Sequence, residues 1–166
     1  MQIFNTMTRQ KEEFVPQTPG EYRIYVCGPT VYNYIHIGNA RPLIVFDTLR
    51  RYLEYRGNKV IYVSNITDID DKLIKKAAEQ GITMKEVAQQ FEAEYLKDAA
   101  GLNCSKPTVQ PRATEHIGQI IKIVKDLIAK GHAYMAKNGD VYFRVKSDPG
   151  YGKLSHLNLD DLESGN

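Results

Sequence analysis

The fold is decided by the stretch from Tyr22 to Val63, which reads YRIYVCGPTVYNYIHIGNARPLIVFDTLRRYLEYRGNKVIYV. Aromatic and β-branched side chains alternate over residues 22–26 and predict a strand. Apolar residues then recur at helical spacing over 43–53, and Gly57 marks the expected end of that helix. Residues 59–63 are more continuously apolar and predict a second, buried strand. Strand, helix and strand in this order predict a βαβ unit and a parallel sheet.

Further helices and a hairpin are predicted downstream. Thr83 stands three residues before Glu86, which is the spacing of a capping box. Asn138 and Gly139 both tolerate positive φ and predict the turn of a β-hairpin. The helical patterns cover 69–77, 87–95 and 117–128, the hairpin strands cover 133–136 and 141–145, and residues 105–111 are expected to form a linker.

A domain boundary is expected near Pro111. Residues 1–110 are predicted to form a parallel α/β half-domain, and residues 111–166 a helix followed by an antiparallel hairpin. The composition, 42% hydrophobic and 25% charged residues, is that of a globular protein. Without a long apolar run or a secretory signal at the start, we expect a cytoplasmic protein and no membrane partner. The net charge of +2 gives no indication of a nucleic-acid partner.

The cysteines and carboxylates do not form a metal motif by spacing. Cys27 and Cys104 are far apart, so counting them gives neither a disulfide framework nor a self-contained zinc site. Spacing alone favours a small core residue at Cys27. The acidic residues that follow Thr67 are interpreted as the first turn of a helix that Thr67 caps, because carboxylates there meet the helix dipole favourably.

The loop between the two predicted strands carries a candidate phosphate site. Ligands of open parallel sheets bind beyond the carboxyl ends of the strands, where helix N-termini offer N–H groups to anions. Gly38 would let a ligand approach the backbone, and His36 and Asn39 could donate hydrogen bonds to one anion. Spacing alone favours a helix cap or a packed surface residue for His36 over phosphate binding.

A resemblance to a known family favours phosphate binding at His36 over a helix cap or a packed surface residue. His36-Ile37-Gly38-Asn39 looks like the HIGH signature of class I aminoacyl-tRNA synthetases, with Asn39 in place of the second His. An Asn amide can donate a hydrogen bond but carries no proton charge. Stretches along the whole chain resemble the cysteinyl-tRNA synthetase family in particular: 4–14, 25–32, 65–72, 111–114 and 152–155.

The resemblance implies a fold and an activity. The fold would be the first half of a Rossmann-like, HUP-type parallel sheet, followed by part of a connective-peptide insertion with a helix and a β-hairpin. The complete enzyme would be an ATP-dependent ligase of protein biosynthesis. It would use ATP, with Mg²⁺, to activate L-cysteine as cysteinyl adenylate and would transfer the cysteinyl group to tRNA(Cys).

The resemblance also implies roles for individual residues. Zn²⁺ is expected to bind the substrate thiolate, because zinc holds thiolate well and a serine hydroxyl poorly. This difference separates two amino acids that packing alone distinguishes weakly. The implied residues are Cys27 on zinc; Gly28, Thr67 and Asp68 around the substrate cysteine; and Thr30, His36, Gly38 and Asn39 on ATP.

The family's second half-domain, KMSKS loop, anticodon-binding helices and remaining zinc ligands would follow Asn166. We therefore expect residues 1–166 to be an incomplete fragment, inactive alone. Two alternatives stay open. A related ATP-dependent ligase joins cysteine to an amino-sugar acceptor and shares the ATP motif and the zinc cysteine, although residues 65–72 favour the synthetase. A non-catalytic, truncated relative would only bind nucleotide.

One thiolate does not retain zinc, since structural and catalytic zinc sites use at least three protein ligands. Residues 1–166 expressed alone are therefore expected to hold no stoichiometric zinc at Cys27 after dialysis. Metal analysis by atomic emission checks this, with Cys27→Ser as the control. Zinc that is tightly held by the wild-type fragment and lost in C27S would contradict the prediction.

Overall fold

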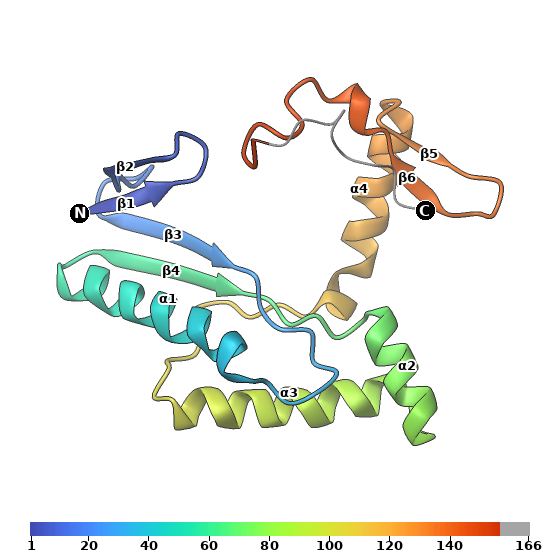
Figure 1. The fold of residues 1–166 in the computed structure, drawn as a ribbon, viewed down its shortest axis with the longest axis horizontal. Helices are drawn as coiled ribbons and strands as arrows, with labels where there is room; N and C mark the ends of the chain where they lie inside the picture. The colour runs from blue at the N-terminus through green and yellow to red at the C-terminus, as the bar shows by residue number, and fades with distance from the viewer. Residues whose placement is uncertain (157–166) are drawn as a thin grey trace. The chain divides into compact units, whose positions relative to one another are not determined.

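Two parallel strands joined by a helix form the framework of the larger part of the protein. In the computed structural model, which describes residues 1–156, β3 (Glu21–Val26) pairs in parallel with β4 (Lys59–Ser64) along its whole length. The helix α1 (Ile37–Tyr55) connects them (Figure 1). The predicted βαβ unit is therefore confirmed.

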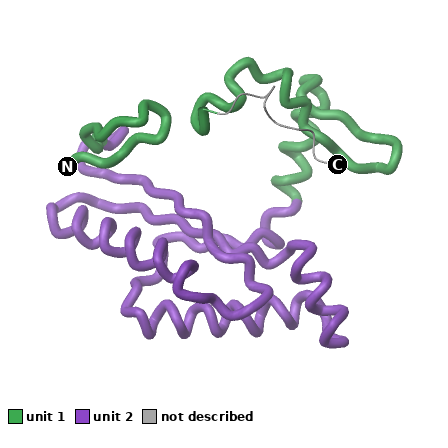
Figure 2. The backbone as a smooth tube through the Cα atoms, in the orientation of Figure 1, with its two compact units in different colours: residues 1–15, 118–166 green, residues 16–117 purple. Residues whose placement is uncertain are grey.

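The chain divides into two compact units (Figure 2). The larger unit, residues 16–117, holds β3, α1 and β4. It also contains α2 (Asp71–Gln80), α3 (Met84–Gly101) and the short helix η1 (Ala113–His116). The smaller unit combines residues 1–15 with the described residues from 118 onward. All predicted site residues lie in the larger unit.

A third segment extends the parallel sheet on the other side of β4. The amide of Ser64 donates to the carbonyl of Val109 (3.2 Å), and the amide of Ile66 donates to the carbonyl of Pro111 (2.8 Å). The sequence predicts only a linker here, because its prolines argue against a strand. Proline lacks an N–H but keeps its carbonyl, and at Pro111 this pairing uses the carbonyl alone.

Helix α1 begins earlier than predicted. Its first residue is Ile37, so residues 37–41, expected to belong to the preceding loop, are helical. The reason is a capping box. The His36 side chain accepts from the backbone amide of Gly38, and the Asn39 side chain accepts from the backbone amide of His36. At the other end Gly57 adopts φ +82°, the left-handed conformation in which the helix was predicted to stop.

Helices α2 and α3 build the hydrophobic core of the larger unit. The capping box predicted from Thr83 and Glu86 is confirmed, and α2 ends at Gly81 with φ +66°. The prediction that Thr67 caps α2 is wrong: Asp70 is the N-cap and accepts from the amide of Lys72 (2.9 Å). The buried core residues are Val31, Ile66, Leu73, Ala77, Val87, Ala88, Phe91 and Tyr95.

The smaller unit contains two hairpins and most of a helix. The strands β1 (Gln2–Asn5) and β2 (Gln10–Glu13) pair antiparallel and were not predicted. The second hairpin, β5 (Ala133–Met135) and β6 (Val141–Phe143), confirms the prediction from the Asn-Gly pair. Only Gly139 takes a positive φ, +91°, because the turn is a three-residue loop closed by a bond from the amide of Ala136 to the carbonyl of Asp140 (2.8 Å). The short helix η2 (Val145–Ser147) follows.

Helix α4 (Ile117–Ala129) has an apolar stripe without buried residues. Ile120, Ile121 and Ile123 are 46%, 48% and 60% exposed. The 3.6-residue period that predicted the helix is therefore present, and in the described structure much of its apolar face is exposed, with Val124 and Leu127 half-buried. No helix in the described part of the chain has the length and apolar character needed to cross a membrane.

The backbone passes unusually close to itself where β3 and β4 end. The amide of Gly28 donates to the side-chain oxygen of Asn65 (2.9 Å), and a Cβ atom at position 28 would lie 1.6 Å from the Asn65 carbonyl oxygen. No side chain fits at that distance, so this approach requires glycine.

Replacing Gly28 with Ala is expected to lower the free energy of unfolding by about 3 kcal/mol, because the backbone must move to remove the overlap. Gly101→Ala is the matched control: Gly101 ends α3, and beyond its chain neighbours and its own helix backbone no atom lies within 4 Å of a Cβ at this position. Its change should stay within about 1 kcal/mol. Urea denaturation followed by circular dichroism measures both, and equal stability of the two variants would refute the packing argument.

Candidate functional site

The carboxyl end of β4 and the loop after β3 are joined by backbone pairing. Thr30 and Thr67 form a parallel bridge, in which the amide of Val31 donates to the carbonyl of Thr67 (3.1 Å). The amide of Thr67 donates in turn to the carbonyl of Pro29 (3.0 Å). Parallel pairing thus resumes beyond the strands, shifted by one residue from their register, and fixes the loop at the edge where such folds bind ligands.

The predicted phosphate-binding residues form the start of α1. The ring Nδ1 of His36 accepts from the amide of Gly38 (3.0 Å), and the Asn39 side-chain oxygen accepts from the amide of His36 (3.1 Å). Because Nδ1 accepts, a neutral His36 ring carries its proton on Nε2. The ring Nε2–H and the Asn39 amide nitrogen are thus the donors that these two side chains offer at the positive end of the helix dipole.

Gly38 leaves the space that the His36 ring occupies in this cap. A Cβ atom at position 38 would lie 2.7 Å from Cε1 and 2.9 Å from Nδ1 of His36. The absent side chain therefore makes room for the histidine ring. The sequence prediction gave a different reason, close approach of a ligand to the backbone.

A small pocket of about 120 Å³ brings four of the predicted site residues together. This is below the roughly 300–1,000 Å³ of most ligand pockets. Tyr62 and Tyr95 form part of its wall; burial raises the pKa of Tyr62 and raises that of Tyr95 to about 12, so both phenols are neutral at pH 7. The predicted site residues that line this small pocket are Cys27, Gly28, Gly38 and Asn39.

The other four predicted residues are outside the lining of the small pocket. Thr30 and His36 belong to the same loop, and Thr67 is connected to it through Asn65, whose amide nitrogen donates to the Thr67 hydroxyl (3.1 Å). Asp68 faces elsewhere. Consecutive residues of an extended chain point to opposite sides, which separates the Thr67 and Asp68 side chains.

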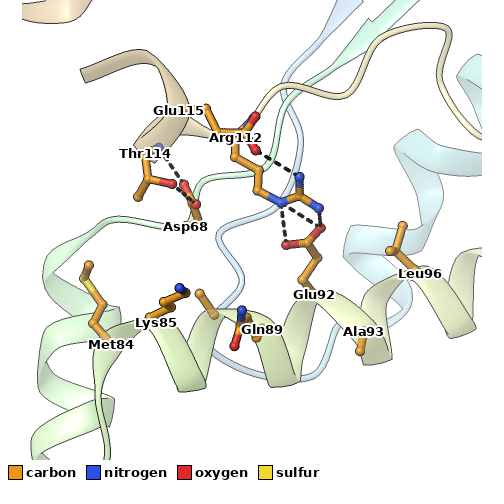
Figure 3. A pocket seen from close by; sticks show the side chains of 11 residues that line it. Asp68, Met84, Lys85, Gln89, Glu92, Ala93, Leu96, Arg112, Thr114 and Glu115 are labelled. Atoms are coloured by element: carbon orange, nitrogen blue, oxygen red, sulfur yellow. Dashed lines mark hydrogen bonds and ion pairs between the residues drawn. The ribbon is translucent and has the colours of Figure 1, made fainter. Parts of the chain in front are cut away.

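Asp68 lines a large pocket of about 800 Å³ (Figure 3). Its carboxylate is buried and accepts from the amide of Thr114 (2.9 Å) and from the Thr114 hydroxyl. In the same pocket Arg112 reaches from the end of the third sheet segment to Glu92 on α3, with Nε 3.0 Å from a carboxylate oxygen. The hydrogen bond to Glu92 raises the pKa of Arg112 further, so the guanidinium stays charged.

The described residues do not by themselves make a zinc site. Cys27 is exposed and unpaired with another cysteine. Among residues 1–156 no three His, Cys, Asp or Glu side chains are grouped closely enough to hold a metal ion. A zinc site needs three or four ligands, so Cys27 alone does not fit one and no chemical step is assigned to a metal here.

Sequence reasoning missed Asn65. It follows β4 directly, at the same edge of the sheet as Cys27, and its side chain bonds to Gly28, Thr67 and the Tyr25 hydroxyl. The available signal was a polar residue placed immediately after a buried strand of a predicted parallel sheet.

Comparison with known proteins identifies the family. The model of the catalytic domain of class I (C) tRNA synthetases matches residues 13–166. A cysteine–tRNA ligase of Levilactobacillus brevis is 60% identical over 165 residues, which are 99% of this chain and 35% of that protein. A cysteine–tRNA ligase of Lachnoclostridium phytofermentans is 58% identical over 165 residues, which are 99% of this chain and 35% of that protein.

The chain thus spans about a third of the length of these relatives. The match covers the strand–loop–helix segment and the residues after β4 on which the sequence resemblance rested. The resemblance read from those motifs is confirmed. The chain belongs to the family of class I (C) tRNA synthetase catalytic domains.

Proposed function

We propose that the protein containing this chain activates L-cysteine with ATP and transfers the cysteinyl group to tRNA(Cys). The observation that carries the proposal is 60% identity, over 99% of the chain, to a protein named cysteine–tRNA ligase. The convergence of Cys27, Gly28, Gly38 and Asn39 on one small pocket supports it from the structure.

The start of α1 is the proposed ATP site. His36 and Asn39 present donors beside the N-terminal end of a helix of 19 residues, where the dipole favours negative charge. Donors already fixed by the capping box need little reorganisation as charge develops on the phosphates during adenylate formation. Thr30 and Gly38 complete this proposed site, and Mg²⁺ is expected to accompany ATP.

The ends of β3 and β4 are the proposed cysteine site. Gly28 and Thr67 would contact the amino acid, and Cys27 would give one thiolate to a Zn²⁺ ion whose further ligands would have to lie outside residues 1–156. Asp68 is the proposed site residue with the least support, because its carboxylate is occupied by Thr114 on the large-pocket side.

For the fold we propose the first half of a Rossmann-like sheet over residues 1–110 and the start of a connective insertion over 111–166. The support is the order of the parallel segments. Residues 108–112 pair with the side of β4 opposite β3, after a crossover through α2 and α3. This order, with helical crossovers, is typical of a doubly wound half.

The function is tested by cysteine-dependent exchange of pyrophosphate into ATP, on the full-length gene product and on residues 1–166 in parallel. We expect exchange in the full-length product only, with cysteine preferred over serine by a factor of at least about 10³, since a metal–thiolate contact separates the two better than packing does. Charging of tRNA and of an amino-sugar acceptor is then compared; transfer to the amino sugar, or absence of exchange, would contradict the proposal.

A further inference from the structure

The side chain of Asn65 connects the two parts of the proposed cysteine site. Its oxygen accepts from the amide of Gly28 (2.9 Å) and from the hydroxyl of Tyr25 (3.0 Å), and its nitrogen donates to the hydroxyl of Thr67 (3.1 Å). We propose that Asn65 is a positioning residue: it fixes the backbone beside Cys27 and sets the hydrogen-bond direction of Thr67. This inference rests on the proposed function.

The network determines which way the amide faces. A backbone N–H can only donate, so the atom of Asn65 that faces Gly28 is the oxygen. The nitrogen therefore faces Thr67, and the Thr67 hydroxyl accepts from it. A hydroxyl that accepts in this way keeps its own hydrogen to donate elsewhere. Thr67 is thereby set to donate to an acceptor atom of the bound amino acid.

The position of Asn65 favours a role in the site over a role in the core. The neighbouring Ile66 is fully buried and packs into the core cluster, whereas Asn65 is half-buried on the opposite side of the extended chain. Two of its partners, Gly28 and Thr67, belong to the proposed cysteine site. A change at Asn65 should therefore affect cysteine binding more than stability.

Asn65→Asp keeps the shape of the side chain at position 65 but reverses the direction of its hydrogen bond with the Thr67 hydroxyl. The carboxylate still accepts from Gly28 and Tyr25, but it can only accept from Thr67, whose hydrogen is then withdrawn from the substrate. In the full-length gene product we expect the KM for cysteine to rise about tenfold or more, the loss of one hydrogen bond. The KM for ATP should change by less than about twofold, because His36 and Asn39 are untouched.

Asn58→Asp is the matched control. The Asn58 side chain donates to the carbonyl of Leu53 at the end of α1, so the variant makes the same chemical change away from the site. Both KM values of N58D should stay within about twofold of the wild type. Asn65→Ser, whose shorter side chain cannot bridge Gly28 and Thr67, is a second route to the same rise in the KM for cysteine if N65D does not fold.

A double-mutant cycle separates positioning from a general structural effect. Thr67→Val removes the hydroxyl, so adding N65D to it should raise the KM for cysteine by no more than about twofold further. In a Thr67→Ser background, which keeps the hydroxyl, N65D should raise the KM for cysteine about as much as it does in the wild-type background. A purely structural Asn65 would instead give the same rise in both backgrounds.

The outcomes distinguish this inference from the function on which it rests. If the wild-type gene product catalyses no cysteine-dependent exchange, the proposed function is overturned and this inference with it. If the wild type is active and folded N65D or N65S keeps an unchanged KM for cysteine, or if the cycle is additive, only the role of Asn65 is overturned.

Discussion

The rest of the structure depends on the backbone pairing between Thr30 and Thr67. Through this bridge, parallel pairing extends beyond β3 and β4, with a shift of one residue, into two segments that have no regular secondary structure. It holds the Gly28 backbone against Asn65, which leaves no space for a side chain at position 28. It also brings the chain to the start of α1, where His36 and Asn39 form the cap. A few backbone hydrogen bonds thus fix the loop that carries most of the predicted site.

Elements whose signal is local could be predicted from the sequence. The alternation over 22–26 and the helical spacing over 43–53 gave the βαβ unit, because each pattern reports burial of one face. The capping box at Thr83 and the Asn-Gly turn were predicted because each depends only on residues within a few positions of one another. The same locality explains why the end of α1 at Gly57 was found.

Features that depend on distant partners could not be predicted. The strands β1 and β2 are mostly exposed and carry no alternation, and residues 108–112 pair with β4 despite two nearby prolines. Threonine is a favoured N-cap residue, but the backbone pairing of Thr67 with Thr30 overrides that preference. In the site, the motif His36-Ile37-Gly38-Asn39 was enough to locate the loop. The separation of the Asp68 side chain from that of Thr67, and the hydrogen bonds by which Asn65 connects Gly28 and Thr67, depend on the three-dimensional pairing of distant segments.

The largely exposed apolar stripe of α4 has a consequence for the dynamics of this helix. An isolated helix of 13 residues is marginal in water, and in proteins most of a helix's stability comes from tertiary packing. Helix α3 buries five of its side chains and has that support, whereas α4 buries none. Within this chain the amide hydrogens of α4 should therefore exchange with solvent through local opening, long before those of α3, whose protection reports the opening of the core.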